Sequence, residues 1–414
     1  MLDPSLPIRM QSCMRRLFRA ALFAGSLQFL TFQASVSSTA MIDSLLHEAR
    51  QKFAPDRRTT VFNVIGRLEE GTLVISGEVH DVALHDSLMA FLRSRVSDPL
   101  KDSVTALPRA DLGEYVYGVV NVSVGNIRGA PAQSAELVNQ ALLGSPLRVL
   151  KKEQSWYFVQ TPDDYLGWMD DGFQLMNRKQ YEHWDNLPKL IVTVAYGFTG
   201  EAPTDSGRVV SDVVVGAILA LEEEAGEFYR VAYPDGRTGY LPKHDAQRVR
   251  EWLEEAEATP ERIVATAQRF TGIPYLWGGT SAKGFDCSGL TKIVYFLNGL
   301  LLPRDAGQQA AVGDPVDSGS DFSHVRAGDL LFFGSDATGT KGRRVTHVGI
   351  SLGGHEFINA SGNPGYVLIN SLRPSHPAYS EHRRETFLFV RRIIGAGEQS
   401  GVRRVSTLSH FHGS

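Results

Sequence analysis

Two stretches of the 414-residue chain share one pattern, and this repeat constrains the fold more than any other feature. The two copies are residues 142–169 (LLGSPLRVLKKEQSWYFVQTPDDYLGWM) and 214–241 (VVGAILALEEEAGEFYRVAYPDGRTGYL). Each has a glycine, then apolar residues, a charged turn, an aromatic residue and valine. Each then passes through Pro-Asp to a second glycine beside an aromatic residue. Short alternating strands separated by glycine, proline and aspartate are typical of small β-barrels. We therefore expect tandem barrels over residues 113–172 and 190–250.

The chain on either side of the repeat divides into two further units. Residues 41–110 have the apolar periodicity of a helix, a hairpin and a second helix, which predicts a small α+β unit with no recognisable catalytic motif. Residues 259–394 are expected to form the last domain, whose first helix begins with Thr259 as N-cap and Pro260 at the first helical position. The remaining residues, 395–414, are rich in Gly, Ser and Arg and are expected to be disordered.

The N-terminus has the order of charges and apolar residues typical of a secretory signal. Three arginines precede the apolar run AALFAGSLQFLTF, and small residues follow up to Ala40. We predict that residues 1–40 are a signal peptide, that Met14 is an alternative start, and that the mature protein is periplasmic or extracellular. A core helix is the alternative interpretation, because the run is too short for a stable membrane span. Loss of Cys13 with this segment would leave Cys287 as the one cysteine, without a disulfide partner.

Charge and motif spacing exclude several classes of function. The formal net charge of −4 provides no electrostatic footprint for nucleic acid. The histidines lack the spacing of a zinc site, and the chain has neither a CxxC pair nor a nucleophile-elbow serine motif. We therefore expect no metal and no cofactor.

Cys287, in the stretch GFDCSGL, is a candidate nucleophile. The apolar residues that follow it recur at helical spacing up to Leu297, so the cysteine is predicted at or just before a helix N-terminus. Exposed N–H groups and the positive end of the helix dipole would stabilise a thiolate there. Gly289 would leave room for a substrate carbonyl beside the sulfur. The alternative is an inert thiol in the core.

A thiol nucleophile needs a base, and His347 is the best candidate. The segment VTHVGISL alternates as a strand, which would hold His347 rigidly on a face cleared by small neighbours. The other histidines considered, His324, His355 and His376, fall in stretches that read as loops.

Asn359 is the candidate for the group that orients His347. The segment EFINAS returns after Gly353-Gly354, and side chains of a strand alternate between its faces. A three-residue turn that sets Ser351 opposite His355 would place His347 directly opposite Asn359. A two-residue turn would put them on opposite faces. In the first case, the amide oxygen could accept from one imidazole nitrogen and leave the other facing the sulfur.

Four motifs in order, YLWGGTSAKGFDCSGL, GDLLFF, THVGI and FINASG, resemble the NlpC/P60 cell-wall cysteine peptidases, which have a papain-like α+β fold. The resemblance covers residues 259–394, and the two repeats resemble bacterial SH3 domains. This combination is similar to the dipeptidyl-peptidase VI subgroup, which cleaves γ-D-glutamyl-L-diamino acid bonds. The resemblance implies Cys287 as nucleophile, His347 as base and Asn359 as the polar third member. Many relatives have histidine at this last position.

The resemblance also implies a subsite for the free amine of an N-terminal L-alanine. Its residues would be Tyr275, Asp286, Ser288 and Asp305 from the catalytic domain and Glu136 and Tyr165 from the first barrel. Alternatives are a helix cap for Asp305 and a solvated surface role for Glu136. Ala306 stands where the subgroup often has serine.

The expected function is hydrolysis of the γ-D-glutamyl-L-diamino acid bond in murein peptides by a cysteine peptidase. The alternatives are an amidase or acyltransferase on the same fold, a DL-endopeptidase acting on intact peptidoglycan, and a non-catalytic wall-binding protein. The expected partners are murein peptides or peptidoglycan fragments, with no nucleic acid and no stable membrane span.

Overall fold

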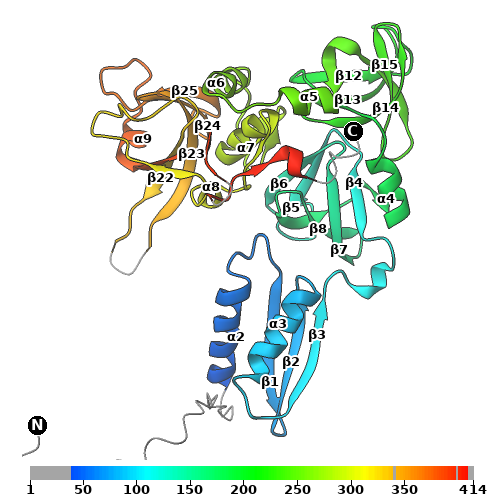
Figure 1. Ribbon diagram of the computed structural model, residues 1–414, viewed down its shortest axis with the longest axis vertical. Helices are drawn as coiled ribbons and strands as arrows, with labels where there is room; N and C mark the ends of the chain where they lie inside the picture. The colour runs from blue at the N-terminus through cyan, green and yellow to red at the C-terminus, as the bar shows by residue number, and fades with distance from the viewer. Residues whose placement is uncertain (1–38, 339–341, 398–399, 409–414) are drawn as a thin grey trace, which may run out of the picture.

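The computed structural model describes residues 39–338, 342–397 and 400–408. It contains an N-terminal α+β unit, two barrels and a C-terminal α+β domain, with the N-terminal unit beneath the others in the view of Figure 1. The predicted signal segment lies outside the described residues except for Thr39 and Ala40, which already belong to helix α2. In the described part of the chain, no helix is long and apolar enough to cross a membrane.

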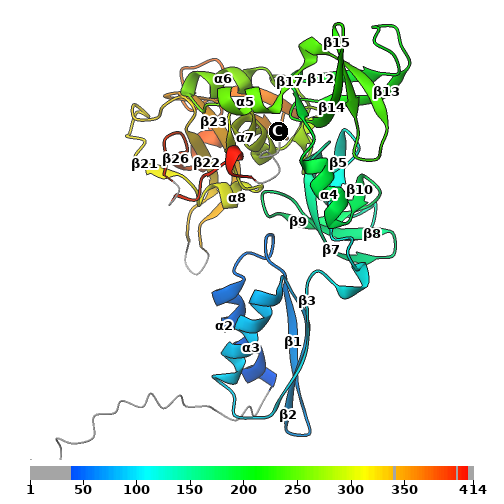
Figure 2. The same ribbon diagram turned by 45° about the vertical axis from the view of Figure 1, so that its right-hand side comes forward.

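The N-terminal unit has two helices packed on a three-stranded sheet of order β1-β2-β3. The predicted hairpin and both helices are confirmed, whereas the third strand, which pairs parallel with the second, was not predicted. The elements are α2 (Thr39–Phe53), β1 (Phe62–Glu69), β2 (Thr72–Val79), α3 (Val82–Arg93) and β3 (Leu100–Ala106). The segment between α2 and β1 points toward the other domains (Figures 1 and 2).

The repeat folds into two seven-stranded sheets with matching irregularities. The first comprises β4 (Tyr117–Val120), β5 (Val124–Arg128), β6 (Leu137–Leu142), β7 (Pro146–Glu153), β8 (Trp156–Gln160), β9 (Leu166–Met169) and β10 (Phe173–Met176). After α4 (Arg178–Asp185) come β11 (Lys189–Val192), β12 (Tyr196–Gly200), β13 (Val209–Val214), β14 (Ile218–Ala225), β15 (Phe228–Ala232), β16 (Thr238–Pro242) and β17 (Ala246–Arg248). The register shifts after Val149 in the first copy and after Leu221 in the second, at equivalent positions of the repeat. Both copies therefore use the same β-bulge.

The C-terminal domain is built on a six-stranded antiparallel sheet of order β21-β26-β22-β23-β24-β25. Its strands are β21 (Asp314–Val316), β22 (Leu330–Ser335), β23 (Arg344–Gly353), β24 (Glu356–Ser361), β25 (Tyr366–Ser371) and β26 (Phe387–Arg392). Around it lie α5 (Val249–Glu255), α6 (Pro260–Gln268), β18 (Thr280–Ser281), β19 (Gly284–Phe285), α7 (Cys287–Leu297), β20 (Leu300–Leu301), α8 (Ala306–Gln309) and α9 (Glu381–Thr386). Thr259 caps α6 and Pro260 opens it, as predicted. Helix α7 packs on β23 and β24 within the main core.

The C-terminal segment is ordered between residues 400 and 408, so the prediction of a disordered tail is wrong for these residues. Strand β27 (Arg403–Arg404) pairs with β20, and Val402 and Val405 are buried. This segment runs from the C-terminal α+β domain back to the barrels (Figure 1). Burial of these two valines offsets the polar composition on which the prediction rested.

The first barrel is joined to the last domain by buried polar contacts. Thr280 donates its backbone N–H to the Gln140 side-chain oxygen at 2.9 Å and its hydroxyl to the Gln140 carbonyl at 2.9 Å. Lys292 forms an ion pair of 2.6 Å with Asp163, and both side chains are largely buried. Buried ion pairs need close partners because desolvation is costly. The contact therefore fixes the barrel beside the start of α7.

Candidate active site

A cleft of about 450 Å³ lies where the N-terminal unit, the first barrel and the C-terminal domain meet. All predicted site residues except Asn359 line it. These are Cys287, His347, Tyr275, Asp286, Ser288, Asp305, Tyr165 and Glu136. Residues more than 200 positions apart thus share one cavity. Within the described ranges, no group of three or more His, Cys, Asp or Glu side chains is arranged to hold a metal ion.

Cys287 is the first residue of α7, as predicted, and Asp286 is its N-cap. The Asp286 carboxylate accepts from the backbone N–H of Gly289 at 2.7 Å. Gly289 was expected to make room for substrate, but the structure shows that packing inside the protein requires glycine at this position. A Cβ at this position would lie 2.0 Å from the backbone oxygen of Gly279. Glycine therefore lets α7 approach the turn that precedes it.

His347 on β23 and Asn359 on β24 share one face of the sheet. The His347 Nε2 lies 2.8 Å from the Asn359 Oδ1. The Asn359 amide nitrogen donates to Asn370 Oδ1 at 3.0 Å and to the Leu368 carbonyl at 3.3 Å. These two acceptors fix the orientation of the amide, so its oxygen accepts from the ring and Nε2 carries the hydrogen. Nδ1 is then the nitrogen left for chemistry.

The turn that brings this pair together differs from the predicted one. Gly353 pairs with Glu356 across a two-residue turn, and the register shifts between Ser351 and Gly353, so that Ser351 faces Phe357 instead of His355. A two-residue turn alone would put His347 and Asn359 on opposite faces of the sheet. The extra residue in the bulge shifts the register by one position, so the two side chains lie on the same face. His347 and Asn359 therefore face the same side but stand diagonally, rather than directly opposite each other.

Burial opposes charge on both reactive side chains in the empty cleft. Burial raises the pKa of Cys287 to about 11, and the Asp286 carboxylate adds to this rise, while backbone hydrogen bonds from Val348 and Ser288 act against it. Burial also lowers the pKa of His347 to about 3, and the nearby Arg383 guanidinium lowers it further. Burial therefore favours a neutral thiol and a neutral imidazole in the empty cleft, and it opposes the thiolate that the helix terminus was expected to stabilise.

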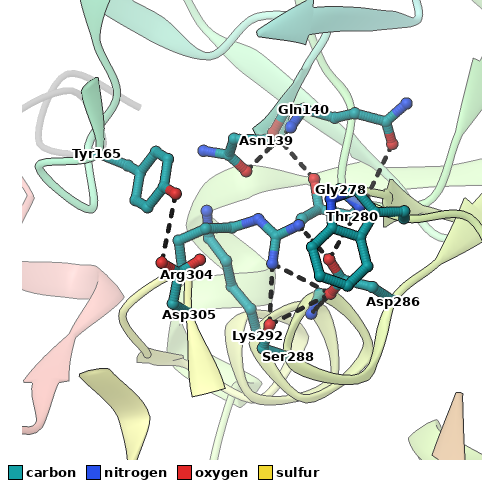
Figure 3. A network of polar contacts seen from close by, with 12 residues as sticks. Asn139, Gln140, Tyr165, Gly278, Thr280, Asp286, Ser288, Lys292, Arg304 and Asp305 are labelled. Carbon is teal, nitrogen blue, oxygen red and sulfur yellow. Dashed lines mark hydrogen bonds and ion pairs between the residues drawn. The ribbon is translucent and has the colours of Figure 1, made fainter. Parts of the chain in front are cut away.

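Arg304 is a buried cation that sequence reasoning missed. Its guanidinium reaches Asp286 Oδ2 at 2.5 Å and donates to the Ser288 hydroxyl at 2.9 Å (Figure 3). Burial alone would lower the pKa of Arg304, but the Asp286 carboxylate outweighs burial and raises it. Asp286 and Ser288 line the cleft, yet their polar atoms already have partners. The geometry therefore supports a positioning role for both beside Cys287.

The first barrel supplies the polar groups at another part of the cleft. The Tyr165 hydroxyl donates to Asp305 Oδ2 at 3.3 Å, and Figure 3 shows the ring pointing at that carboxylate. Glu136 accepts a hydrogen bond of 2.8 Å from the indole N–H of Trp277, a further residue that the prediction omitted. Asp305 is the N-cap residue of α8 and also lines the cleft, so its two interpretations are compatible.

Arg58 and Arg383, like Arg344, also line the cleft, and no sequence signal marks either of them. Arg58, from the segment after α2, contacts Asp305, although no chemistry was expected in the N-terminal unit. Arg383, on α9, has its charge close to Cys287 and Tyr275. Both lie in ordinary charged stretches of the sequence, which resemble solvated surface. Arg304 at least stands next to the predicted Asp305.

Comparison with known proteins places this geometry in a family. Residues 272–384 match the NlpC/P60 family, and residues 127–172 match the bacterial dipeptidyl-peptidase Sh3 domain. A protein named gamma-D-glutamyl-L-lysine dipeptidyl-peptidase from Bacillus cereus is 33% identical, over 54% of this chain and 67% of the relative. A protein of the same name from Bacillus subtilis is 31% identical, over 53% and 71%. Dipeptidyl-peptidase 6 from Lysinibacillus sphaericus is 28% identical, over 66% and 97%.

A solved structure of an NlpC/P60 family protein from Bacillus cereus is similar to this chain over almost the whole length of that protein. It superposes with a TM-score of 0.57 at 27% identity, covering 67% of this chain and 99% of that chain. The fold class expected from the sequence, a papain-like α+β domain with SH3-like barrels, is confirmed. The chain belongs to the NlpC/P60 family of cysteine peptidases.

Proposed function

We propose that this chain hydrolyses the amide bond between γ-D-glutamate and the following L-diamino acid in cell-wall peptides that begin with a free L-alanine. The observation that carries the proposal is the single cleft in which Cys287 and His347 meet acidic and tyrosine side chains of the first barrel. The names of the relatives from Bacillus cereus and Bacillus subtilis point to the same bond.

In the proposed reaction, Cys287 is the nucleophile and His347 is the base. Because both groups are neutral at rest, the thiol passes its proton to Nδ1 of His347 as the sulfur attacks the γ-carbonyl carbon of D-glutamate. Backbone N–H groups in the first turn of α7 would stabilise the oxyanion. His347 then protonates the leaving amine as the C–N bond breaks and a thioester remains. Water, deprotonated by His347, releases the L-alanyl-D-glutamate.

Asn359 orients the base in this scheme. An amide oxygen at Nε2 fixes the ring and its tautomer without adding a negative charge. Asn359 is itself fully buried and held by Asn370, so the ring has a rigid support.

The specificity for a short peptide would come from the polar groups around Asp305. An ammonium that leaves water needs a carboxylate partner. Asp305, with the Tyr165 hydroxyl on one of its oxygens, is placed to accept the amine of L-alanine. Glu136 is the second carboxylate lining the cleft. An acylated amine carries no charge and could not form an ion pair with either carboxylate.

We also propose that the protein acts outside the cytoplasm, after removal of residues 1–40. The arginine-flanked apolar run supports export.

The proposal predicts cleavage of L-Ala-γ-D-Glu-L-Lys to L-Ala-D-Glu and free L-lysine. Acetylation of the alanine amine is expected to reduce kcat/KM by about 100-fold, because the neutral amide cannot form the ion pair with Asp305 that the ammonium would form. Chromatography with mass spectrometry of the products measures both rates. If the free and acetylated peptides were cleaved equally well, the amine subsite would be wrong. If the wild type cleaved neither, the proposed function would fail.

A further inference from the structure

The N-terminal unit contributes a cation to the amine end of the cleft. Arg58 lies between α2 and β1, and its Nη1 donates to Asp305 Oδ2 at 2.9 Å. That oxygen also accepts from Tyr165. Neither family match reaches this unit, since they begin at residues 127 and 272. Arg58, which donates in this contact, therefore lies outside the two matched domains.

Asp56 already balances the charge of Arg58. The Arg58 Nε donates to Asp56 Oδ1 at 2.8 Å, and its Nη2 donates to Asp56 Oδ2 at 2.9 Å. This two-bond fork is the strongest geometry for an arginine–carboxylate pair. One guanidinium with two carboxylates leaves a net charge of −1 at Asp56, Arg58 and Asp305. The group therefore remains able to attract an ammonium, while the third arm of Arg58 fixes the direction of the Asp305 carboxylate.

The segment that holds Arg58 is anchored on both sides of the cleft. The Arg58 carbonyl accepts from the backbone N–H of Leu166 at 2.8 Å, next to Tyr165 in the first barrel. On the side of the catalytic domain, Asp56 accepts from the Gln308 side chain at 2.8 Å. Arg58 is thus held by the barrel through its backbone and by α8 through its partner Asp56.

Arg58 also lines a second hollow beside the cleft. It lines the catalytic cleft, and together with Asp56, Asp164 and Arg403 it lines a neighbouring cavity on the surface. Removal of its side chain would open the end of the cleft into this neighbouring space. The position is suited to limit how much peptide can precede the glutamate.

We propose that Arg58 is a specificity-determining residue, which orients Asp305 for the substrate ammonium and closes the cleft after a single N-terminal residue. This inference rests on the proposed function and names a role for the N-terminal unit in it. Arg58 acts through Asp305 and as a wall, so it is a positioning residue rather than a catalytic one.

The test compares two peptides with the full chain and with Arg58→Ala. The peptides are L-Ala-γ-D-Glu-L-Lys and the same peptide extended by an N-terminal glycine. Arg58→Ala is expected to lower the ratio of kcat/KM for the shorter to the longer peptide by about tenfold, as for a lost hydrogen bond to a charged group. The loss appears as a higher KM for the shorter peptide, with kcat changed less than twofold. The ratio is independent of the fraction of enzyme that is folded.

Two further variants separate this role from a general effect. Asp56→Asn releases the fork on Arg58 and is expected to shift the ratio in the same direction. Arg403→Ala removes another guanidinium of the second hollow, which pairs with Asp164 at 3.1 Å, and is expected to leave the ratio unchanged. An unchanged ratio in Arg58→Ala, or an equal shift in Arg403→Ala, overturns the inference while the proposed function stands. Failure of the wild type on the shorter peptide would instead refute the proposed function.

Discussion

Replacement of Cys287 by alanine is expected to lower the turnover of L-Ala-γ-D-Glu-L-Lys by at least about 10⁴-fold. The variant lacks the sulfur that forms the thioester, and no second cysteine lines the described cleft. Side chains that act as one catalytic unit lose nearly all their effect together, so the residual rate should reflect binding and the oxyanion donors alone. Single-turnover kinetics with product detection measures the loss.

The chain offers a matched control for this substitution. Cys13 is its other cysteine, and Cys13→Ala should retain full turnover in the full-length chain. Calorimetry should show that Cys287→Ala still binds the peptide, because the charged groups around Asp305 are untouched. More than one hundredth of wild-type turnover in Cys287→Ala would remove this residue from its proposed role.

Replacement of Arg304 by methionine is expected to destabilise the catalytic domain by about 3–5 kcal/mol. The Arg304 side chain is 1% exposed, and its partner Asp286 is 11% exposed, so the variant leaves a carboxylate buried without its cation. Asp286 also caps α7 at Cys287, which couples this loss to the nucleophile. The melting transition of the domain should fall by roughly 10 °C.

An exposed ion pair serves as the comparison for Arg304. Arg343→Met breaks a pair with Asp336 whose side chains are 48% and 65% exposed, and it should cost less than about 1 kcal/mol. The double variant Arg304→Met with Asp286→Ala should be more stable than Arg304→Met alone, because no unpaired carboxylate remains. Equal melting temperatures for Arg304→Met and Arg343→Met would show that the buried pair contributes no more than a surface one.

Much of the fold and the chemical core of the site could be predicted because the signals are local. The repeat period specified two barrels, and even their bulges fall at equivalent positions. Cys287 precedes an apolar helical pattern, and His347 lies in an alternating strand, so each pattern places its residue on a defined element. Parity alone left two possibilities for His347 and Asn359, and the pair shares a face because of a bulge that was not predicted.

The features that sequence reasoning missed depend on packing between distant segments. Arg58 reaches Asp305 only because the N-terminal unit docks against two other domains, and its loop has the composition of any solvated turn. The bulge between Ser351 and Gly353 depends on how β23 and β24 pair within the sheet, which the residues of the turn do not show. The raised pKa of Cys287 follows from the depth of its burial, a quantity that helix position alone does not provide.

The central claim is that Cys287 carries the acyl group during hydrolysis, and mass spectrometry of a rapidly quenched reaction tests it most directly. With L-Ala-γ-D-Glu-L-Lys as substrate, we predict a transient mass increase of one alanyl-glutamyl group on the peptide that contains Cys287, absent from Cys287→Ala. Steady turnover with no adduct at any quench time, or with the adduct on another residue, would contradict the account.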